Sequence, residues 1–371
     1  MNETPPLPPA PLRIAYLDSV RGLAALAVVV FHFLTWQWAH LLRVQLATLV
    51  FNGSAAVSVF FVLSGLVLSL KYFHPNQQRP LDGPHYRAFV AGRVVRIYLP
   101  YLAAFVGFYY LLFHWGEAPG ALLRQLFSSK TPWVAEALLL RGDHSVYGPG
   151  WSLEVEVMGS LLLPFLVLLL RHSRSLFLML MGVYVGLGPP LVPGLLLHFM
   201  LGLLLAYYFP RIAGDELRAS RFFRWRYLGY LLAFAGLSFR HLARLVPLGP
   251  EGTYWLGLLR LDAFFFAGIG ATLLLAYIIN SPRVRRGLEV GPLLFLGRIS
   301  YSVYLVHWVF VSWGITRLNA YLLRDATHQQ LVIGAALVGV VLATLGAATA
   351  FHLLVERPCI RLGKRLEMRL G

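Results

Sequence analysis

The chain has 371 residues, of which 58% are hydrophobic and only 13% are charged, and its mean hydropathy is +0.67. These values exclude an ordinary soluble multidomain protein and are typical of an integral membrane protein. The net charge of +16 comes from short basic clusters between apolar runs, a pattern that favours orientation on an anionic membrane face over a nucleic-acid-binding stripe.

Apolar windows predict an all-α membrane bundle of about ten spans with both termini cytoplasmic. Most of the 32 Lys and Arg residues fall in the segments that this order of spans places inside. We expect a disordered Pro-rich N-terminus (1–13), a membrane domain (14–365) and a short cytoplasmic tail (366–371). The spans are predicted near 20–40, 47–70, 97–115, 151–170, 175–191, 193–210, 227–246, 255–280, 292–316 and 331–355.

The first span carries an arginine near its start and a histidine deep inside it. Arg21 and His32 are almost a whole number of turns apart, so they share a helix face, with His32 about 16 Å deeper at 1.5 Å per residue. Asp18 lies one turn before Arg21, where it can pair with it. A histidine inside an apolar helix indicates either a functional site or a hydrogen bond within the bundle.

The second and third spans carry two further motifs. Phe60, Phe61, Ser64 and Gly65 lie in an apolar helix that has one face of small residues. This face is suited to close helix packing, or to forming the wall of a narrow channel for a thin ligand. Arg93 and Arg96 share one helix face at the predicted inner end of the third span. They form either a phosphate-binding fork or ordinary topology-setting charge.

Polar residues also mark the outer end of the fourth span. Trp151 and Ser152 precede Glu154 and Glu156, and the two carboxylates point to different faces of the predicted helix. One of them could therefore enter a shared site. The alternative is interfacial anchoring, with Trp151 in the aromatic belt.

The last two spans add a second intramembrane histidine and a buried-charge motif. Ser300, Tyr301 and His307 belong to the ninth span, where a structural hydrogen bond is one reading of the histidine. Glu356 is followed by Arg357 and a proline, which predicts an ion pair that closes the last span at the inner surface.

Taken together, these stretches resemble the acyltransferase type 3 family, integral membrane proteins that O-acylate sugars and other hydroxyl acceptors. The resemblance runs from about residue 14 to residue 365. It implies a catalytic role for His32 and an acyl-CoA role for Arg93 and Arg96. The matching patterns are Arg21 with His32, Phe60-Phe61 with Ser64-Gly65, Arg93 with Arg96, Trp151-Ser152-Leu153 with Glu156, Gly297 to Tyr301 with His307-Trp308, and Glu356-Arg357-Pro358.

The resemblance predicts a multi-pass enzyme of the cell membrane that moves an acyl group, most simply acetyl, from cytoplasmic acyl-CoA to a hydroxyl of a carbohydrate or lipid-linked sugar. Arg93 and Arg96 would hold the CoA phosphates, and the pantetheine arm would pass along the face of Ser64 toward His32. Phe60, Phe61 and Gly65 are assigned to the same path.

A neutral imidazole, whose ordinary pKa is about 6.5, is suited to accept the hydroxyl proton. We predict that Glu156 orients His32 or stabilises its charged form. Arg21 is assigned to CoA binding or to holding Asp18, and an acyl-His32 intermediate fits as well as direct transfer. The residues assigned to substrate or structural support are Asp18, Trp151, Ser152, Ser300, Tyr301, His307 and Glu356.

The competing reading is a proton-coupled transporter or flippase, in which His32, Glu156 and His307 relay protons. Such transporters use broken half-helices in related halves of the chain, and the Gly-Pro-Pro run within 188–193 is a candidate break that has no matching break earlier in the sequence. No metal-ligand pair such as His-Glu-x-x-His occurs, and the lone Cys359 excludes a cysteine metal site and an internal disulfide. We expect acyl-CoA as a substrate, membrane lipids as surroundings, and no permanently bound cofactor.

Overall fold

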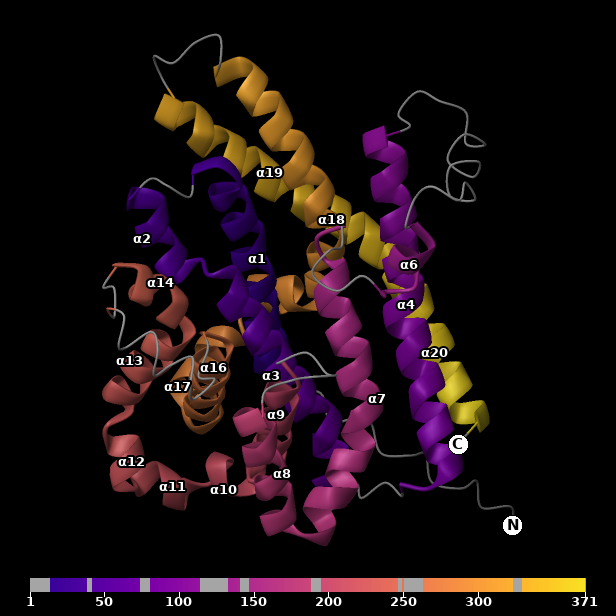
Figure 1. The fold of residues 1–371 in the computed structure, drawn as a ribbon, viewed down its shortest axis with the longest axis vertical. Helices are drawn as coiled ribbons and strands as arrows, with labels where there is room; N and C mark the ends of the chain where they lie inside the picture. Colours follow the sequence, from indigo (N-terminus) through magenta and orange to yellow (C-terminus); the bar gives the residue numbers. More distant parts are fainter. Residues whose placement is uncertain are drawn as a thin grey trace.

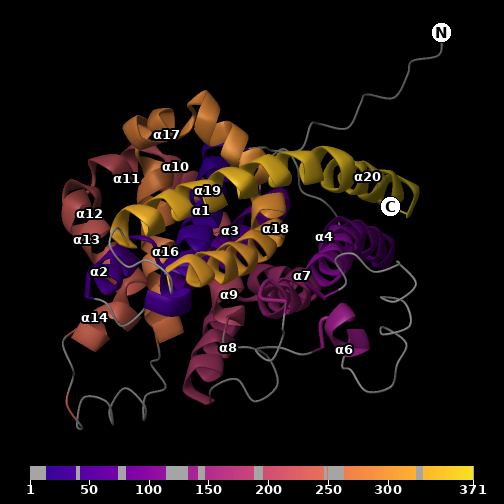
Figure 2. The same ribbon diagram turned by 90° about the horizontal axis from the view of Figure 1, so that it is seen from above.

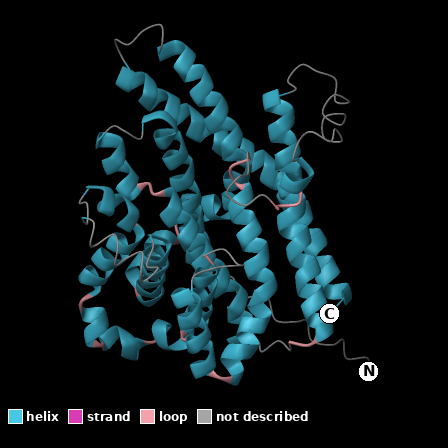
Figure 3. Cartoon of the chain, viewed as in Figure 1, coloured by secondary structure: helices cyan, strands magenta, loops and turns pink. Residues whose placement is uncertain are grey.

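The computed structural model describes residues 14–38, 42–73, 81–113, 133–140, 147–187, 195–245, 249, 263–322 and 329–370. Every regular element in these ranges is a helix (Figure 3), which confirms the predicted all-α class. The helices are α1 (Ala15–Trp38), α2 (Leu42–Val50), α3 (Gly53–Phe73), α4 (Gly83–Phe113), α6 (Trp133–Ala137), α7 (Gly150–His172), α8 (Arg174–Leu187), α9 (Leu196–Tyr207), α10 (Phe209–Ala213), α11 (Asp215–Ala219), α12 (Arg221–Arg224), α13 (Arg226–Leu237), α14 (Phe239–Leu245), α16 (Ala263–Asn280), α17 (Pro282–Leu288), α18 (Gly291–Leu322), α19 (Gln329–Phe351), the π-helix η2 (His352–Glu356) and α20 (Arg357–Leu370).

Within the described ranges, six helical segments are long and apolar enough to cross a membrane. They are Ala15–Trp36, Val44–Phe73, Gly83–Leu111, Gly150–His172, Gly291–Leu318 and Gln330–Leu370. A seventh arises if α16 and α17, bent by 96° at their junction, count as one span. The predicted fifth and sixth spans are instead two shorter apolar helices, α8 and α9. The count of about ten and the side of the termini therefore stay predictions.

Three helices at the edge of the bundle present large apolar side chains outward. Met179 of α8, Leu231 of α13 and Leu342 of α19 are each at least 60% exposed. The same helices also expose Val183, Leu232 and Val338, and a bundle surrounded by lipid requires apolar side chains of this kind on its outside. Composition and exposure thus agree on a membrane protein.

At the centre of the bundle, α1 and α18 lie side by side (Figures 1 and 2). They run parallel and touch through glycine backbones. A Cβ atom on Gly22 would lie 2.6 Å from the backbone nitrogen of Gly297, and one on Gly297 would lie 2.5 Å from the carbonyl carbon of Asp18. Only glycine allows two helices to approach this closely, as in the small-residue interfaces of membrane helices.

A second glycine contact joins α3 to α9, which runs antiparallel to it. A Cβ on Gly65 would collide with the backbone of Phe199, and one on Gly202 with the backbone of Val62. The small-residue face predicted for the second span therefore packs against a helix. Almost all of α9 is buried, although it is too short to span a membrane by itself.

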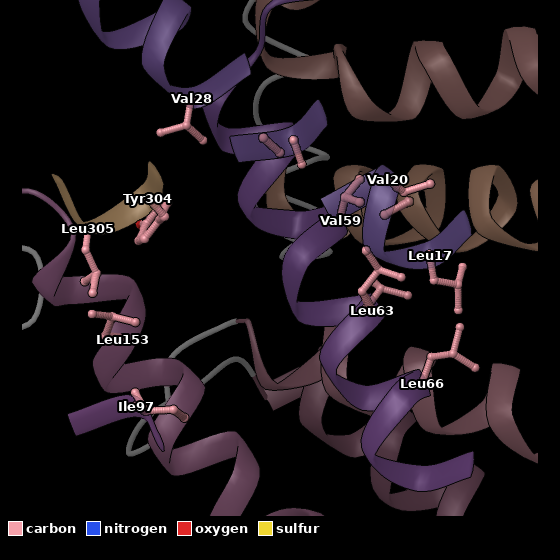
Figure 4. Packing of buried hydrophobic residues seen from close by; sticks show 14 of the residues in the cluster. Leu17, Val20, Val28, Val59, Leu63, Leu66, Ile97, Leu153, Tyr304 and Leu305 are labelled. Atoms are coloured by element: carbon pink, nitrogen blue, oxygen red, sulfur yellow. The ribbon is translucent and has the colours of Figure 1, made fainter. Parts of the chain in front are cut away.

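The largest hydrophobic cluster forms where α1 crosses α3 and extends to α4, α7 and α18 (Figure 4). Leu17 and Val20 of α1 lie beside Leu63 and Leu66 of α3. Each is at most 7% exposed. This cluster fixes α1, which carries both Arg21 and His32.

The end of the chain continues as one helical path through α19, η2 and α20. Pro358 has no N–H and its ring clashes with the carbonyl four residues back, so the α-helical register is disfavoured there. The chain widens to a π-helix just before it, and the backbone N–H of Arg357 bonds the carbonyl of His352. α20 then packs along α4 through Gly363 and Gly92, so the predicted tail is helical to Leu370.

Candidate functional site

Two histidines from distant parts of the chain meet between α1 and α18. The Nδ1 atom of His32 lies 3.1 Å from the Nε2 atom of His307. The ring planes are inclined by 14° and the centroids are 5.2 Å apart. That separation nearly equals the N–N distance plus the two ring radii, so the rings meet edge to edge, as an N–H···N bond requires. We call His32 and His307 the histidine pair.

The second ring nitrogen of His307 is anchored to the backbone. Its Nδ1 atom lies 2.6 Å from the carbonyl oxygen of Tyr304, one turn earlier in α18. The Tyr304 hydroxyl shares a short hydrogen bond with Ser152 of α7, and the Tyr147 hydroxyl donates to the carbonyl of Leu305 at 2.5 Å. These contacts hold the middle of α18 against the start of α7.

Aromatic rings border the histidine pair on one side. The ring of Trp308 stands edge-on to that of His32, with centroids 5.2 Å apart, and Trp36 lies 5.1 Å from Trp308. Trp36 is 44% exposed, whereas His32 is half-buried. The pair is therefore bordered by an accessible aromatic surface, which we call the tryptophan platform (Trp36 and Trp308).

A charged network lies nearer the start of α1 and draws on four elements. Glu156 of α7 accepts hydrogen bonds from Arg93 Nη2 at 2.5 Å and from Ser64 Oγ at 3.1 Å. The same Nη2 atom also donates to Ser160 Oγ at 2.9 Å. Glu156 is thus placed against Arg93 and not beside His32, because a buried carboxylate is best stabilised by a cation and a hydroxyl donor.

Five charged side chains interact electrostatically in this region, and we call them the arginine cluster. They are Arg21, Arg93, Arg96, Glu156 and Glu356. Arg21 also pairs with Asp18 at 3.2 Å, which confirms the pairing predicted from their spacing. Arg93 and Arg96 lie inside α4 and not at the start of a span, because α4 begins at Gly83 instead of near residue 97.

The two arginines of the predicted fork have different surroundings. Arg93 is 13% exposed and tied to Glu156 and Ser160, although its Nε atom is buried without a partner in the described ranges. Arg96 is exposed and has no hydrogen-bond or ion-pair partner among the described residues. Arg93 therefore holds the helices together, while Arg96 is the cation available to an anionic ligand.

The contacts of Glu356 differ from the prediction that it pairs with Arg357 and ends the helix. It is 5% exposed, accepts a hydrogen bond from Ser302 Oγ at 2.6 Å and lies 2.9 Å from His352 Nδ1. The helix does not end there, because the π-helix η2 lets it continue into α20. The wider π turn aims Glu356 into the bundle, and such turns frequently occur at functional sites.

The remaining predicted site residues are structural in their contacts. Phe60 packs edge-on to Tyr304, Phe61 packs on Phe199, Trp151 borders a buried apolar cluster, Ser300 Oγ donates to the carbonyl of Gly297, and Tyr301 donates to the carbonyl of Ile97. Together with Gly65, they connect α3, α4, α7, α9 and α18.

One face of α7 connects the two sites. Ser152, Glu156 and Ser160 are four residues apart, so they form a stripe along the helix. Ser152 reaches Tyr304 beside the histidine pair, and the other two reach Arg93. A neutral imidazole base, a nearby polar stripe and an accessible arginine together can activate a hydroxyl beside a bound polyanion.

The sequence of this chain matches the model of the acyltransferase type 3 family, described as an acyltransferase domain, over residues 14–352. It is also similar to acyltransferase MdmB of Streptomyces mycarofaciens, with 26% identity over 97% of this chain and 95% of that protein. No solved structure matches.

Proposed function

The chain belongs to the acyltransferase type 3 family, and we propose that it is a membrane O-acyltransferase that uses acyl-CoA. The observation that supports this proposal is a half-buried imidazole, His32, held on one nitrogen, together with an exposed arginine, Arg96, in the arginine cluster that the face of α7 also reaches. An acetyl donor is the simplest member of the class, and a cell-membrane location with a cytoplasmic donor follows from the basic charge of the predicted inner segments.

In the reaction that we propose, His32 accepts the proton of an acceptor hydroxyl as its oxygen attacks the thioester carbonyl carbon. A C–O bond forms and the C–S bond breaks. The CoA thiolate leaves and takes the proton from the imidazolium, so that the products are an ester and CoA with a free thiol. Arg96 and Arg21 bind the CoA phosphates, while Arg93 keeps Glu156 in place.

The tryptophan platform supports a carbohydrate or glycosylated acceptor. Trp36 is accessible, and Trp308 touches the ring of His32. Flat aromatic faces bind the apolar faces of sugar rings through contact area and leave the sugar hydroxyls free. A hydroxyl held on this platform lies close to the base.

The transporter alternative gains no support from the described helices. It requires broken half-helices in corresponding halves of the chain. The described residues contain one bent pair, α16 and α17, and α17 is a short helix with three arginines. The Gly-Pro-Pro run within 188–193 lies outside the described residues.

The experiment that tests the proposal is acetyl-CoA turnover by purified full-length protein in detergent. We expect slow release of CoA without an acceptor, because water can replace the hydroxyl, and a loss of about 10³-fold in His32→Ala. His198→Gln is the matched control, because His198 is also buried in the bundle but lies in α9 away from the histidine pair. A well-folded wild-type protein that neither binds nor consumes acetyl-CoA contradicts the proposal.

A further inference from the structure

The hydrogen bonds of the histidine pair determine which nitrogen carries each proton. A carbonyl oxygen only accepts, so the contact from His307 Nδ1 to the carbonyl of Tyr304 requires a proton on that nitrogen. A neutral His307 then has a lone pair on Nε2. Its partner at 3.1 Å, His32 Nδ1, must supply the proton of the bond between the rings.

The neutral form of both rings follows from their surroundings. His307 is 1% exposed, and the hydrogen-bond contacts of the two rings are with uncharged groups: each other and the backbone of α18, including the carbonyl of Tyr304. A charged ring without a counter-ion is costly in such a place. Glu156, the carboxylate that the sequence suggested as the partner of His32, is bound to Arg93 instead.

We propose that His307 is the positioning residue for His32: it holds His32 in the tautomer with the proton on Nδ1, which leaves the lone pair on Nε2 as the base. The kinetic consequence of this inference rests on the proposed function. The assignment of the tautomer does not, because it follows from the hydrogen bonds alone. His307 thus has the orienting role that sequence analysis gave to Glu156, and it does so without a charge.

The arrangement also explains what happens when His32 takes up a proton. The new proton goes to Nε2 of His32, and the charged ring continues to donate through Nδ1 to the lone pair of His307. His307 keeps its own proton on the Tyr304 carbonyl, so no proton needs to pass along the pair. The charge is stabilised by a stronger, charge-assisted hydrogen bond that is already in place.

The position of His307 is itself fixed by three contacts around it. Tyr304 is held to Ser152 of α7, and Tyr147 bonds the neighbouring carbonyl of Leu305. The Gly22–Gly297 contact sets the height of α18 against α1. These contacts allow His307 little freedom to turn away from His32.

The direct test is nitrogen NMR of the full-length protein labelled with ¹⁵N-histidine, in detergent or lipid. The signals of His32 are identified by their loss in His32→Gln. We expect His32 to carry its proton on Nδ1 in the wild type and to change to the Nε2 tautomer in His307→Ala. A proton on Nε2 of His32 in the wild type, or no change in His307→Ala, overturns the inference.

The kinetic test compares His307→Ala with His307→Gln, since the glutamine carbonyl can still accept a hydrogen bond. We expect His307→Ala to lower kcat about 100-fold with the KM for acetyl-CoA unchanged, and His307→Gln to recover about tenfold of that loss. His198→Gln is the control for removing a buried histidine. Equal rates for the alanine and glutamine variants, both well folded, contradict a positioning role.

The two tests separate this inference from the proposed function. If the wild type turns over no acetyl-CoA but His32 shows the Nδ1 proton and loses it in His307→Ala, the positioning role is supported and the acyltransferase proposal fails. If the enzyme turns over acetyl-CoA and His32 is protonated on Nε2, the enzyme proposal is supported and this inference fails.

Discussion

The histidine pair and the arginine cluster are both carried by α1, about 16 Å apart along the helix at 1.5 Å per residue, but they are built differently. The histidine pair depends on helix backbones, because two parallel helices in glycine contact bring the rings to one level. The arginine cluster depends on charged side chains from four elements. Changes in helix spacing should therefore affect the first, and changes in charge the second.

The largest expected effect in the arginine cluster is loss of the buried ion pair. Arg93→Ala leaves Glu156 without its cation, and we expect a destabilisation of about 3–5 kcal/mol, measured as a lower unfolding temperature in detergent. The double variant Arg93→Met with Glu156→Gln is the control, because it removes both charges and should recover much of the loss. A single variant as stable as the wild type would show that the pair does not hold α4 to α7.

The glycine contact offers the equivalent test for the histidine pair. Gly22→Ala places a Cβ atom against the backbone of Gly297, and we expect a loss of about 1–3 kcal/mol together with reduced turnover. Gly182→Ala is the matched control, since a Cβ there meets nothing within 4 Å and alanine favours a helix. Equal effects of the two variants would contradict the close approach of α1 and α18.

A smaller effect should separate the two arginines that were predicted as one fork. Arg96→Ala is expected to raise the KM for acetyl-CoA about tenfold, equivalent to 1.4 kcal/mol of binding, with no change in unfolding temperature. Arg93→Ala is the comparison, because its main effect is on stability. Loss of stability in Arg96→Ala, with KM unchanged, would reverse the two assignments.

The smallest expected effect concerns the tryptophan platform. Trp36→Ala removes an exposed ring that contacts Trp308 but not His32, so acetyl-CoA hydrolysis in water should stay within about twofold of wild type. Transfer to a carbohydrate acceptor should show a several-fold higher acceptor KM. A fall in hydrolysis of the same size would show that the ring supports the base and not the acceptor.

The sequence was sufficient to predict the helical class, a span overlapping each of the six long apolar segments of the described residues, and the Asp18–Arg21 pair, because these depend on hydropathy and helix spacing. It did not reveal the histidine pair, although both Gly22 to His32 and Gly297 to His307 are separated by ten residues. That equal spacing becomes meaningful only once the helices are known to be parallel and in contact. Pairing between helices depends on packing, which periodicity does not encode.

The prediction that Glu156 contacts His32, and not Arg93, has a similar cause. Its spacing from Ser152 and Ser160 places all three on one face of α7, but the choice between His32 and Arg93 as its partner depends on where α4 lies. The early start of α4 at Gly83 decides this choice, because it brings Arg93 inside the bundle. In the sequence, the residues between Gly83 and the predicted start near residue 97 include many polar side chains, so hydropathy does not mark them as part of the span.

The two rings of the histidine pair are 275 residues apart in the chain. During synthesis, α1 emerges from the ribosome and enters the membrane long before α18 has been translated. The contact between His32 and His307 forms only after α18 has been synthesised and has packed against α1. A nascent or truncated chain that ends before α18 would thus contain the proposed base, His32, without the residue that orients it.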